Sequence, residues 1–201
     1  MNFEAFADGR DGSRRQAAGY PRSVQPDAGF TLIELLVTLT VGGILAAMAV
    51  PAFNSFVQND RQVGQANSLV ISFNYARAEA IKQNLAVGIS VCPSANGTSC
   101  SGSNDWQGGW IVTTDPTGAT PDATLQAVPA LSPSTTLYPH GTGQTGVVFH
   151  STGLVSAPVT INICDSRGAA YARDVELNAT GRAATSQTPG QTVSGIPMSC
   201  S

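Results

Sequence analysis

Charged side chains are scarce in this chain of 201 residues, where they make up 11% of the sequence, against about 25% in an ordinary globular domain. A single lysine, Lys82, stands beside nine arginines, and the formal net charge is −3. Proteins that hold nucleic acid through phosphate contacts usually carry a basic excess. The composition therefore argues against tight electrostatic binding of nucleic acid.

Motifs that mark catalytic or metal centres are also missing. The two histidines, His140 and His150, have no cysteine or carboxylate at metal-ligand spacing nearby, and no HExxH or CxxC pattern occurs. The phosphate-loop pattern GxxxxGK[ST] and the nucleophile pattern GxSxG are absent as well. We therefore expect no enzyme activity, no bound metal and no cofactor.

A long stretch without charge lies near the N-terminus. The segment Phe30–Asn59 contains one charged residue, Glu34, and none from Leu35 onward. About 20 apolar residues suffice to cross the hydrocarbon core of a bilayer as a helix, so this segment is expected to be a membrane helix. A carboxylate in such a segment is costly and is functional by default. Glu34 is therefore a candidate site residue.

The residues around Glu34 resemble the class III signal of the type IV pilin superfamily. Residues 28–34 read AGFTLIE and place the glycine, the aromatic residue and the glutamate in the register of that signal. The resemblance implies that a prepilin peptidase cuts after Gly29, that Phe30 is then N-methylated, and that Glu34 serves subunit assembly. Residues 1–29 would be the leader. Family leaders are short and basic, whereas this one has four arginines against four acidic residues.

Beyond Pro51 the apolar residues recur at the spacing of an amphipathic helix. We expect one helix from Phe30 to about Gln83, roughly 80 Å long at 1.5 Å per residue, with a stop at Asn84. Residues 30–57 would form its membrane or filament-core part and residues 58–83 its amphipathic part. The predicted apolar face is Phe53, Phe56, Val57, Val63, Ala66, Val70, Phe73 and Ala80, and the predicted polar face is Gln58, Asp60, Arg61, Gln65, Asn67, Asn74 and Lys82.

From Leu85 onward apolar residues alternate with small or polar ones, which is the period of β-strands. Breaks rich in Gly, Pro, Ser and Asn separate these runs, as in antiparallel sheets. Residues 84–201 are therefore expected to form a β domain. The fold class is α+β and type IV pilin-like, with the long N-terminal helix packed on a C-terminal antiparallel sheet. The predicted strands are residues 87–92, 110–114, 124–128, 146–150, 159–163 and 174–177.

All four cysteines follow the predicted membrane helix. Disulfides persist in the periplasm and at cell surfaces, and four cysteines allow three pairings. Pairing Cys92 with Cys100 closes a small loop, and pairing Cys164 with Cys200 ties the C-terminal tail to a predicted strand. We favour these pairs because the tail, rich in glycine and proline, offers no regular structure of its own.

Further segments narrow the resemblance to the GspH/FimT family of minor pilins and pseudopilins. Four segments occur in the same order as in that family: ARAEAIKQN, NDWQGGWIVTTD, GVVFHSTGLV and CDSRGAAYARDVELNATGRA. The resemblance covers residues 29 to about 184. Some members bind DNA through a Gly-Arg-x-Arg motif near the C-terminus. Residues 181–184 read GRAA here, without the second arginine. Any DNA binding is therefore expected to be weak and to involve Arg182, with Arg173 and Arg167 as helpers on neighbouring turns.

The resemblance implies a structural subunit. The first hypothesis is a minor pilin that primes or tips a type IV pilus, in pilus biogenesis, twitching or DNA uptake. The second is the minor pseudopilin H of a type II protein secretion system, and the third is a pilus-associated DNA receptor. The implied partners are prepilin peptidase, other minor and major pilins or pseudopilins, and the inner membrane. The chain would cross that membrane once, with its C-terminal domain in the periplasm, before assembly into the pilus or pseudopilus.

Overall fold

A computed structural model describes residues 29–115, 123–131 and 134–200, so residues 1–28 of the predicted leader lie outside the described residues. One long helix, α1 (Leu32–Gln83), precedes all strands, and the short 3₁₀ helices are η1 (Trp106–Gly108) and η3 (Ala169–Tyr171). The chain divides into two compact units, with the boundary between Leu45 and Ala46. Every described strand belongs to the second unit, to which α1 contributes its residues from Ala46 onward.

Helix α1 begins and ends where side chains and turns satisfy its free backbone groups. Thr31 precedes the first helical residue, and its Oγ1 accepts a hydrogen bond from the Glu34 N–H at 3.2 Å, which is the arrangement of an N-cap. At the other end Asn84 has a φ of 48°, the left-handed conformation that asparagine tolerates after a helix. The Asn84 N–H donates to the Ala80 carbonyl at 3.1 Å. The helix therefore stops where the sequence predicted a stop, and it continues through Pro51.

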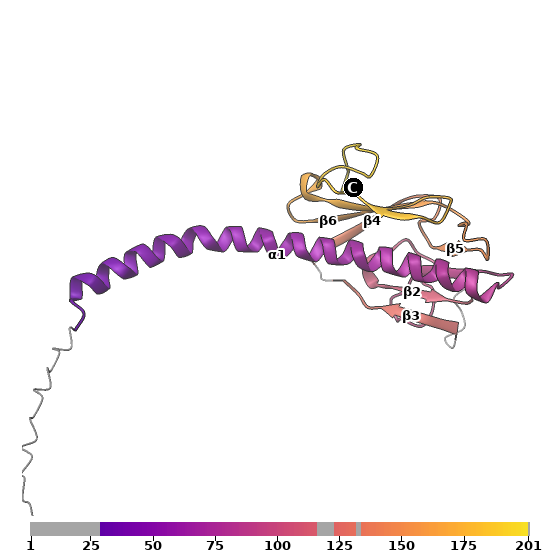
Figure 1. Cartoon of the computed structure of the whole chain (residues 1–201), viewed down its shortest axis with the longest axis horizontal. Coiled ribbons are helices and arrows are strands. Elements are labelled where there is room, and N and C mark those ends of the chain that lie inside the picture. The colour runs from indigo at the N-terminus through magenta and orange to yellow at the C-terminus, as the bar shows by residue number, and fades with distance from the viewer. Residues whose placement is uncertain (1–28, 116–122, 132–133, 201) are drawn as a thin grey trace, which may run out of the picture. The chain divides into compact units, whose positions relative to one another are not determined.

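Two four-stranded antiparallel sheets follow α1, with strand orders β3-β2-β1-β5 and β4-β6-β7-β8. In Figure 1 the second half of α1 lies against both sheets, and one core contains residues from all three. The predicted fold, a long N-terminal helix packed on antiparallel sheet, is therefore confirmed. The strands are β1 (Ile89–Pro93), β2 (Trp110–Thr113), β3 (Thr124–Val128), β4 (Thr135–Gly141), β5 (Val147–Phe149), β6 (Val159–Asp165), β7 (Arg173–Leu177) and β8 (Ala183–Thr185).

Aromatic side chains fill the core between α1 and the first sheet. The ring centroids of Phe73 and Trp106 are 6.3 Å apart in an edge-to-face arrangement. The Trp106 Nε1 donates to the Gln144 carbonyl at 2.7 Å, and the Trp110 Nε1 donates to the Ser72 hydroxyl at 2.9 Å. Both indoles are fully buried, and a buried indole needs a partner for its N–H. The two tryptophans therefore pack the core.

The buried face of α1 differs from the predicted apolar face. Gln65, predicted as polar surface, is only 9% exposed, whereas Val63, predicted as apolar surface, is 37% exposed. Gln62 is also buried, and its Nε2 donates to the Ile163 carbonyl of β6 at 3.4 Å. The helical period determines which residues of α1 face the sheets. Gln62 and Gln65 lie on that face, so their side chains are buried. The buried residues of α1 are Gln62, Gln65, Ala66, Leu69, Ser72, Phe73, Ala76 and Ala80.

Two disulfides close loops in the second unit. Cys92 is bonded to Cys100, with their Cα atoms 5.5 Å apart. Cys164 in β6 is bonded to Cys200 in the C-terminal tail, with a Cα separation of 6.0 Å. Both Cα separations lie within the usual range for disulfides. These are the two pairs that we favoured from the sequence.

Hydrogen bonds hold the C-terminal tail to the second sheet as well. Asp174 of β7 is fully buried, and its two carboxylate oxygens accept the Ser186 N–H at 3.0 Å and the Val193 N–H at 3.1 Å. The Asn162 Nδ2 in β6 donates to the Ser199 carbonyl at 3.0 Å. A buried carboxylate needs such donors because burial without them is costly. Asp174 therefore organises a tail that has little regular structure.

Candidate assembly site

The predicted cleavage point lies in the backbone directly before α1. Gly29 has no neighbouring atom within 4 Å of the position that a Cβ would occupy, and the Phe30 side chain is 86% exposed. The first helical residue is Leu32, so the Gly29–Phe30 bond lies outside the hydrogen-bonded helix. No side chain among the described residues of its unit covers this bond, so a peptidase could reach it.

Glu34 occupies the third position of α1, where its backbone N–H is capped by Thr31. Threonine at the cap and glutamate three residues later form the spacing of a capping box. The exposed carboxylate has no ion pair among the described residues. A negative charge in the first turn is favoured by the helix dipole. Thr31 is a residue that our sequence reasoning missed, and the T-x-x-E spacing was the signal that could have found it.

The first half of α1 presents apolar side chains around its whole circumference. In the described residues α1 is the helix that is long and apolar enough to cross a membrane, judged by length and composition. An exposed apolar surface of this extent marks a membrane or protein contact. We call residues 30–56 the apolar segment. Its large hydrophobic side chains, each at least 48% exposed, are Phe30, Leu32, Ile33, Leu35, Leu36, Val37, Leu39, Val41, Ile44, Leu45, Met48, Val50, Phe53 and Phe56.

Arg167, a predicted helper in DNA binding, is fully engaged within the protein. Its Nε and Nη2 donate to the Asp165 carboxylate at 3.0 and 2.6 Å, and its Nη1 donates to the Asn59 Oδ1 at 2.8 Å. The guanidinium also stacks 4.7 Å from the Tyr171 ring centroid. Burial alone would raise the pKa of Asp165, but the hydrogen bonds from Arg167 outweigh it and hold that pKa below its ordinary value. Arg167 therefore joins the β6–β7 turn to α1.

Arg173 and Arg182 lie at opposite ends of β7. Arg173 begins the strand, and its Nη1 donates to the Ser186 carbonyl at 3.3 Å. The Arg182 carbonyl accepts from the Asn178 N–H just beyond the strand's last residue. Five strand residues span about 16 Å, so the two arginines cannot act as neighbours. The structure therefore does not bring the three predicted arginines together in one cluster.

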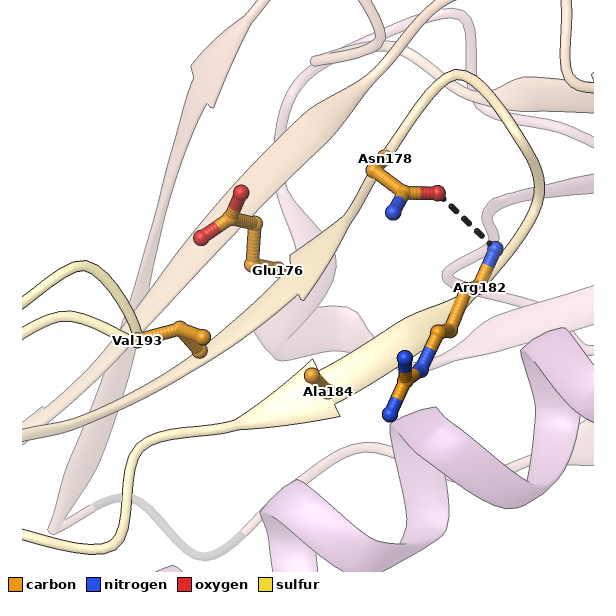
Figure 2. Close-up of a pocket in the computed structure, with 5 residues that line it drawn as sticks. All are labelled: Glu176, Asn178, Arg182, Ala184 and Val193. Atoms are coloured by element: carbon orange, nitrogen blue, oxygen red, sulfur yellow. Dashed lines mark hydrogen bonds between the residues drawn. The ribbon is translucent and has the colours of Figure 1, made fainter.

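Arg182 lines a shallow pocket of about 240 Å³ together with Glu176, Asn178, Ala184 and Val193. Figure 2 shows the Arg182 side chain extending away from Glu176, while its backbone N–H donates to the Asn178 Oδ1 at 3.1 Å. Within the part of the chain that the structure describes, the guanidinium has no ion pair. Of the three predicted arginines, Arg182 therefore has the charge most accessible to an anion.

The backbone before Arg182 requires a glycine, Gly181. Its φ is 74°, and a Cβ there would stand 2.1 Å from the Gly153 carbonyl oxygen. The Arg77 Nε donates to the same carbonyl at 3.2 Å. The β7–β8 turn thus packs directly on the turn that contains Gly153, and only a residue without a side chain permits this approach. The glycine of the Gly-Arg pair therefore has a structural role that is independent of any ligand.

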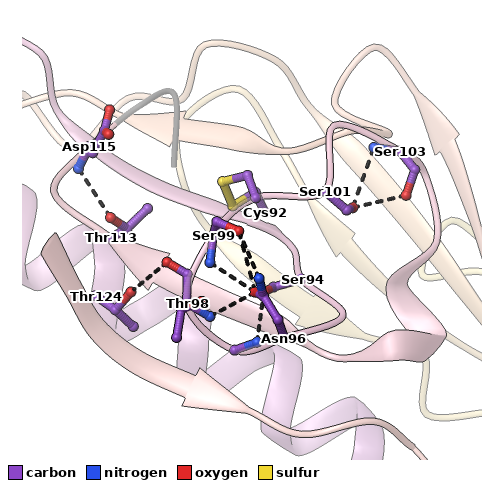
Figure 3. Close-up of a disulfide and its surroundings, with 12 residues drawn as sticks. Cys92, Ser94, Asn96, Thr98, Ser99, Ser101, Ser103, Thr113, Asp115 and Thr124 are labelled. Atoms are coloured by element: carbon purple, nitrogen blue, oxygen red, sulfur yellow. Dashed lines mark hydrogen bonds between the residues drawn. A yellow bond between two sulfur atoms is a disulfide. The ribbon is translucent and has the colours of Figure 1, made fainter. Parts of the chain in front are cut away.

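The loop closed by Cys92 and Cys100 is organised by Asn96. Figure 3 shows its amide surrounded by hydroxyl and backbone groups, and its Oδ1 accepts the N–H groups of Thr98 and Ser99 at 3.0 Å each. Such asparagine-centred turns form without a ligand. Among the described residues no group of three His, Cys, Asp or Glu could hold a metal ion. We assign this loop a structural role.

Comparison with known proteins identifies the family. A family model described as type II transport protein GspH matches residues 65–181, which is more than half of the chain. The chain belongs to the GspH family. A second model, the prokaryotic N-terminal methylation motif, matches residues 25–50 of this GspH-family chain and thus includes Gly29, Phe30 and Glu34.

Relatives of the GspH-family chain include fimbrial proteins. Two proteins named type IV major fimbrial protein FimA from Dichelobacter nodosus are 36% identical over 66 residues and 40% identical over 68 residues. These matches cover 33% and 34% of this chain, which spans about 40% of the length of those relatives. The type IV minor pilin FimU of Pseudomonas aeruginosa has the same fold, with a TM-score of 0.55 at 20% identity over 73% of this chain and 99% of FimU. A second crystal form of FimU gives a TM-score of 0.51 at 21% identity, over 68% of this chain and 97% of FimU.

Cleavage after Gly29 should leave 172 of the 201 residues of the GspH-family chain (201 minus 29). We expect the mature protein to begin at Phe30 with a methyl group on its amine, because Phe30 follows Gly29 within the residues that match the methylation motif. Intact-mass analysis of protein purified from membranes measures this directly. A Gly29→Ala variant should remain unprocessed, and an N-terminus other than Phe30 would contradict the proposed cleavage.

DNA binding by the GspH-family chain should be weak, because Arg167 and Arg173 are engaged elsewhere in the fold. One free arginine contributes about one phosphate contact, so we expect a salt slope near −1 and no binding at physiological salt. Gel shifts of residues 58–201 across a salt series measure this slope. Arg182→Ala should abolish the residual binding, whereas Arg61→Ala, which removes an exposed cation on α1, should not. Tight binding that survives Arg182→Ala would show that another surface is used.

Proposed function

We propose that this chain is a minor pilin, a structural subunit that primes or tips a type IV pilus. The apolar segment, which contains Glu34, carries the proposal, because it is an exposed hydrophobic helix in the same chain as a disulfide-bonded β domain. Lipid covers such a segment before assembly, and the equivalent helices of other subunits cover it in a filament. Prepilin peptidase, other minor and major pilins and the inner membrane are the proposed partners.

Two observations favour the pilus over other machines. A solved structure with the same fold is named a type IV minor pilin, and sequence relatives are named fimbrial proteins. The alternative function is a minor pseudopilin of a type II secretion system, and it is supported by the family description "type II transport protein". Both functions use the same fold, the same processing and the same membrane orientation, with the β domain in the periplasm.

A DNA receptor is the weaker alternative. Its support is the exposed guanidinium of Arg182. The ion pair between Arg167 and Asp165 neutralises a positive charge that a larger DNA-binding surface would need. A receptor role would therefore require several subunits to act together.

Deletion of the gene in the native host separates the first two functions. For a minor pilin, the deletion strain should lose most of its surface pili and keep normal secretion through its type II system. Pili counted by electron microscopy and secreted enzyme activity in the culture medium are the two measurements, and the wild-type gene supplied on a plasmid is the control. Normal piliation with lost secretion would assign the chain to the secretion machine instead.

A further inference from the structure

The β6–β7 turn meets α1 at the end of the uncharged part of the helix. The Arg167 Nη1 donates to the Ser55 carbonyl at 3.3 Å and to the Asn59 Oδ1 at 2.8 Å. The same guanidinium is held by Asp165 at the end of β6. We call residues 166–171 the anchor turn. Its contacts fix it beside the helical turn that contains residues 55–59.

Helix arithmetic gives the depth of that helical turn in a bilayer. The hydrocarbon core is about 30 Å thick and takes about 20 helical residues. Counted from the residue after Glu34, these are Leu35–Asn54. The next five residues, Ser55–Asn59, carry no charge and rise by about 7 Å, which matches the headgroup layer. The anchor turn is bonded to these five residues.

The chemistry of the anchor turn suits that layer. Tyr171 is 48% exposed, and tyrosine is enriched at membrane–water interfaces, where its ring and hydroxyl face different media. The neighbouring charges cancel, because Asp165 neutralises Arg167 and Asp60 stands beside Arg61. Phe56, within the helical turn of residues 55–59, is 60% exposed. An uncharged rim with exposed aromatic rings favours zwitterionic interfaces rather than electrostatic adsorption.

We propose that the anchor turn rests in the outer headgroup layer of the bilayer, with Tyr171 as the interfacial anchor, while the subunit awaits assembly. The occupant of this surface is therefore a phospholipid headgroup region. The inference rests on the membrane-anchored state of the proposed function, but it does not depend on which filament the subunit enters. It assigns Arg167 a positioning role, because its bonds to α1 hold the turn at this depth.

Fluorescence quenching tests the proposal. Full-length processed protein is placed in phosphatidylcholine vesicles, a fraction of whose lipids carry a spin label on the headgroup. The reporter is Tyr171→Trp, and Tyr75→Trp is the matched control, since Tyr75 lies on α1 about 24 Å beyond Asn59. The buried Trp106 and Trp110 are present in both variants, and their signal is subtracted with the wild-type protein. Tryptophan keeps the cation–π contact to Arg167.

We expect headgroup-labelled lipid to quench Tyr171→Trp at least about twofold more than Tyr75→Trp, because tryptophan at position 171 would lie at the interface. The difference should persist at high salt and shrink in an Arg167→Gln background. Equal quenching of the two reporters, in vesicles that carry the protein through a flotation gradient, would overturn the proposal. Failure of the protein to float would instead refute the membrane anchor, and the inference would fall with it.

Discussion

Replacing Glu34 with leucine should leave the chain in the membrane and remove it from filaments. The substitution removes the charge from the apolar segment and deletes the carboxylate, which we propose meets the N-terminal amine of a neighbouring Phe30. In a filament core that amine would stay buried without a partner, and breaking one side of a buried ion pair costs about 3–5 kcal/mol. We therefore expect incorporation into sheared pili to fall at least about tenfold, since 1.4 kcal/mol already gives a factor of ten.

Three further variants separate the effect of the charge from that of the fold in this experiment. Glu34→Gln keeps the size of the side chain and its position in the helix and should also assemble poorly. Glu34→Asp keeps the charge and should retain part of the assembly. Thr31→Ala removes the cap that the Glu34 N–H uses, and it should weaken the first turn by about 1 kcal/mol without abolishing assembly. Immunoblots of membranes and sheared pili measure both pools. Wild-type levels of Glu34→Leu in pili would contradict the role of the carboxylate.

Removing the Cys164–Cys200 disulfide should strongly destabilise the β domain. The bridge closes a loop with a sequence separation of 36, and the chain-entropy model assigns such a loop about 3–4 kcal/mol. Small domains are stable by only about 5–15 kcal/mol, so the double variant Cys164→Ser, Cys200→Ser should lose much of its stability. Urea unfolding of residues 58–201 measures the difference in free energy of unfolding.

The second disulfide supplies the matched control. Cys92 and Cys100 are separated by eight positions, and the same model gives about 2–3 kcal/mol for that loop. The double serine variant of this pair should therefore be the milder of the two. Peptide mapping under non-reducing conditions should recover both pairs, and a peptide that links Cys92 to Cys164 or Cys200 would overturn the tail architecture.

Much of the fold could be predicted because periodicity and breakers act locally. The uncharged run and the 3.6-residue spacing located α1, and Asn84 ended it. Strand β4 escaped prediction because it contains Pro139 and ends at Gly141, which are poor strand formers, and it is tolerated as an edge strand of its sheet. Strand β8 has three small residues, Ala183–Thr185, and no pattern of that length is informative. Strand β8 forms because these residues pair with β7.

The candidate site residues also differ in whether a local pattern predicts them. The motif around Gly29 and Glu34 is contiguous and could be read directly. Arg167 was assigned to DNA from the charge count, but its partner Asn59 is 108 positions away in the sequence. No local pattern reports such a contact. The buried Gln62 gives a second example, since its Nε2 donates to the carbonyl of Ile163, 101 positions away in the sequence.

The continuity of α1 has a mechanical consequence. The helix that bears the apolar segment also supplies eight buried residues to the core between Gln62 and Ala80. A pull along the helix axis, as when a subunit is extracted from a bilayer, would load all of these contacts at once, in shear. A pull at right angles to the axis would detach the helix one turn after another. The contact between α1 and the β domain should therefore resist a force along the helix axis better than a force across it.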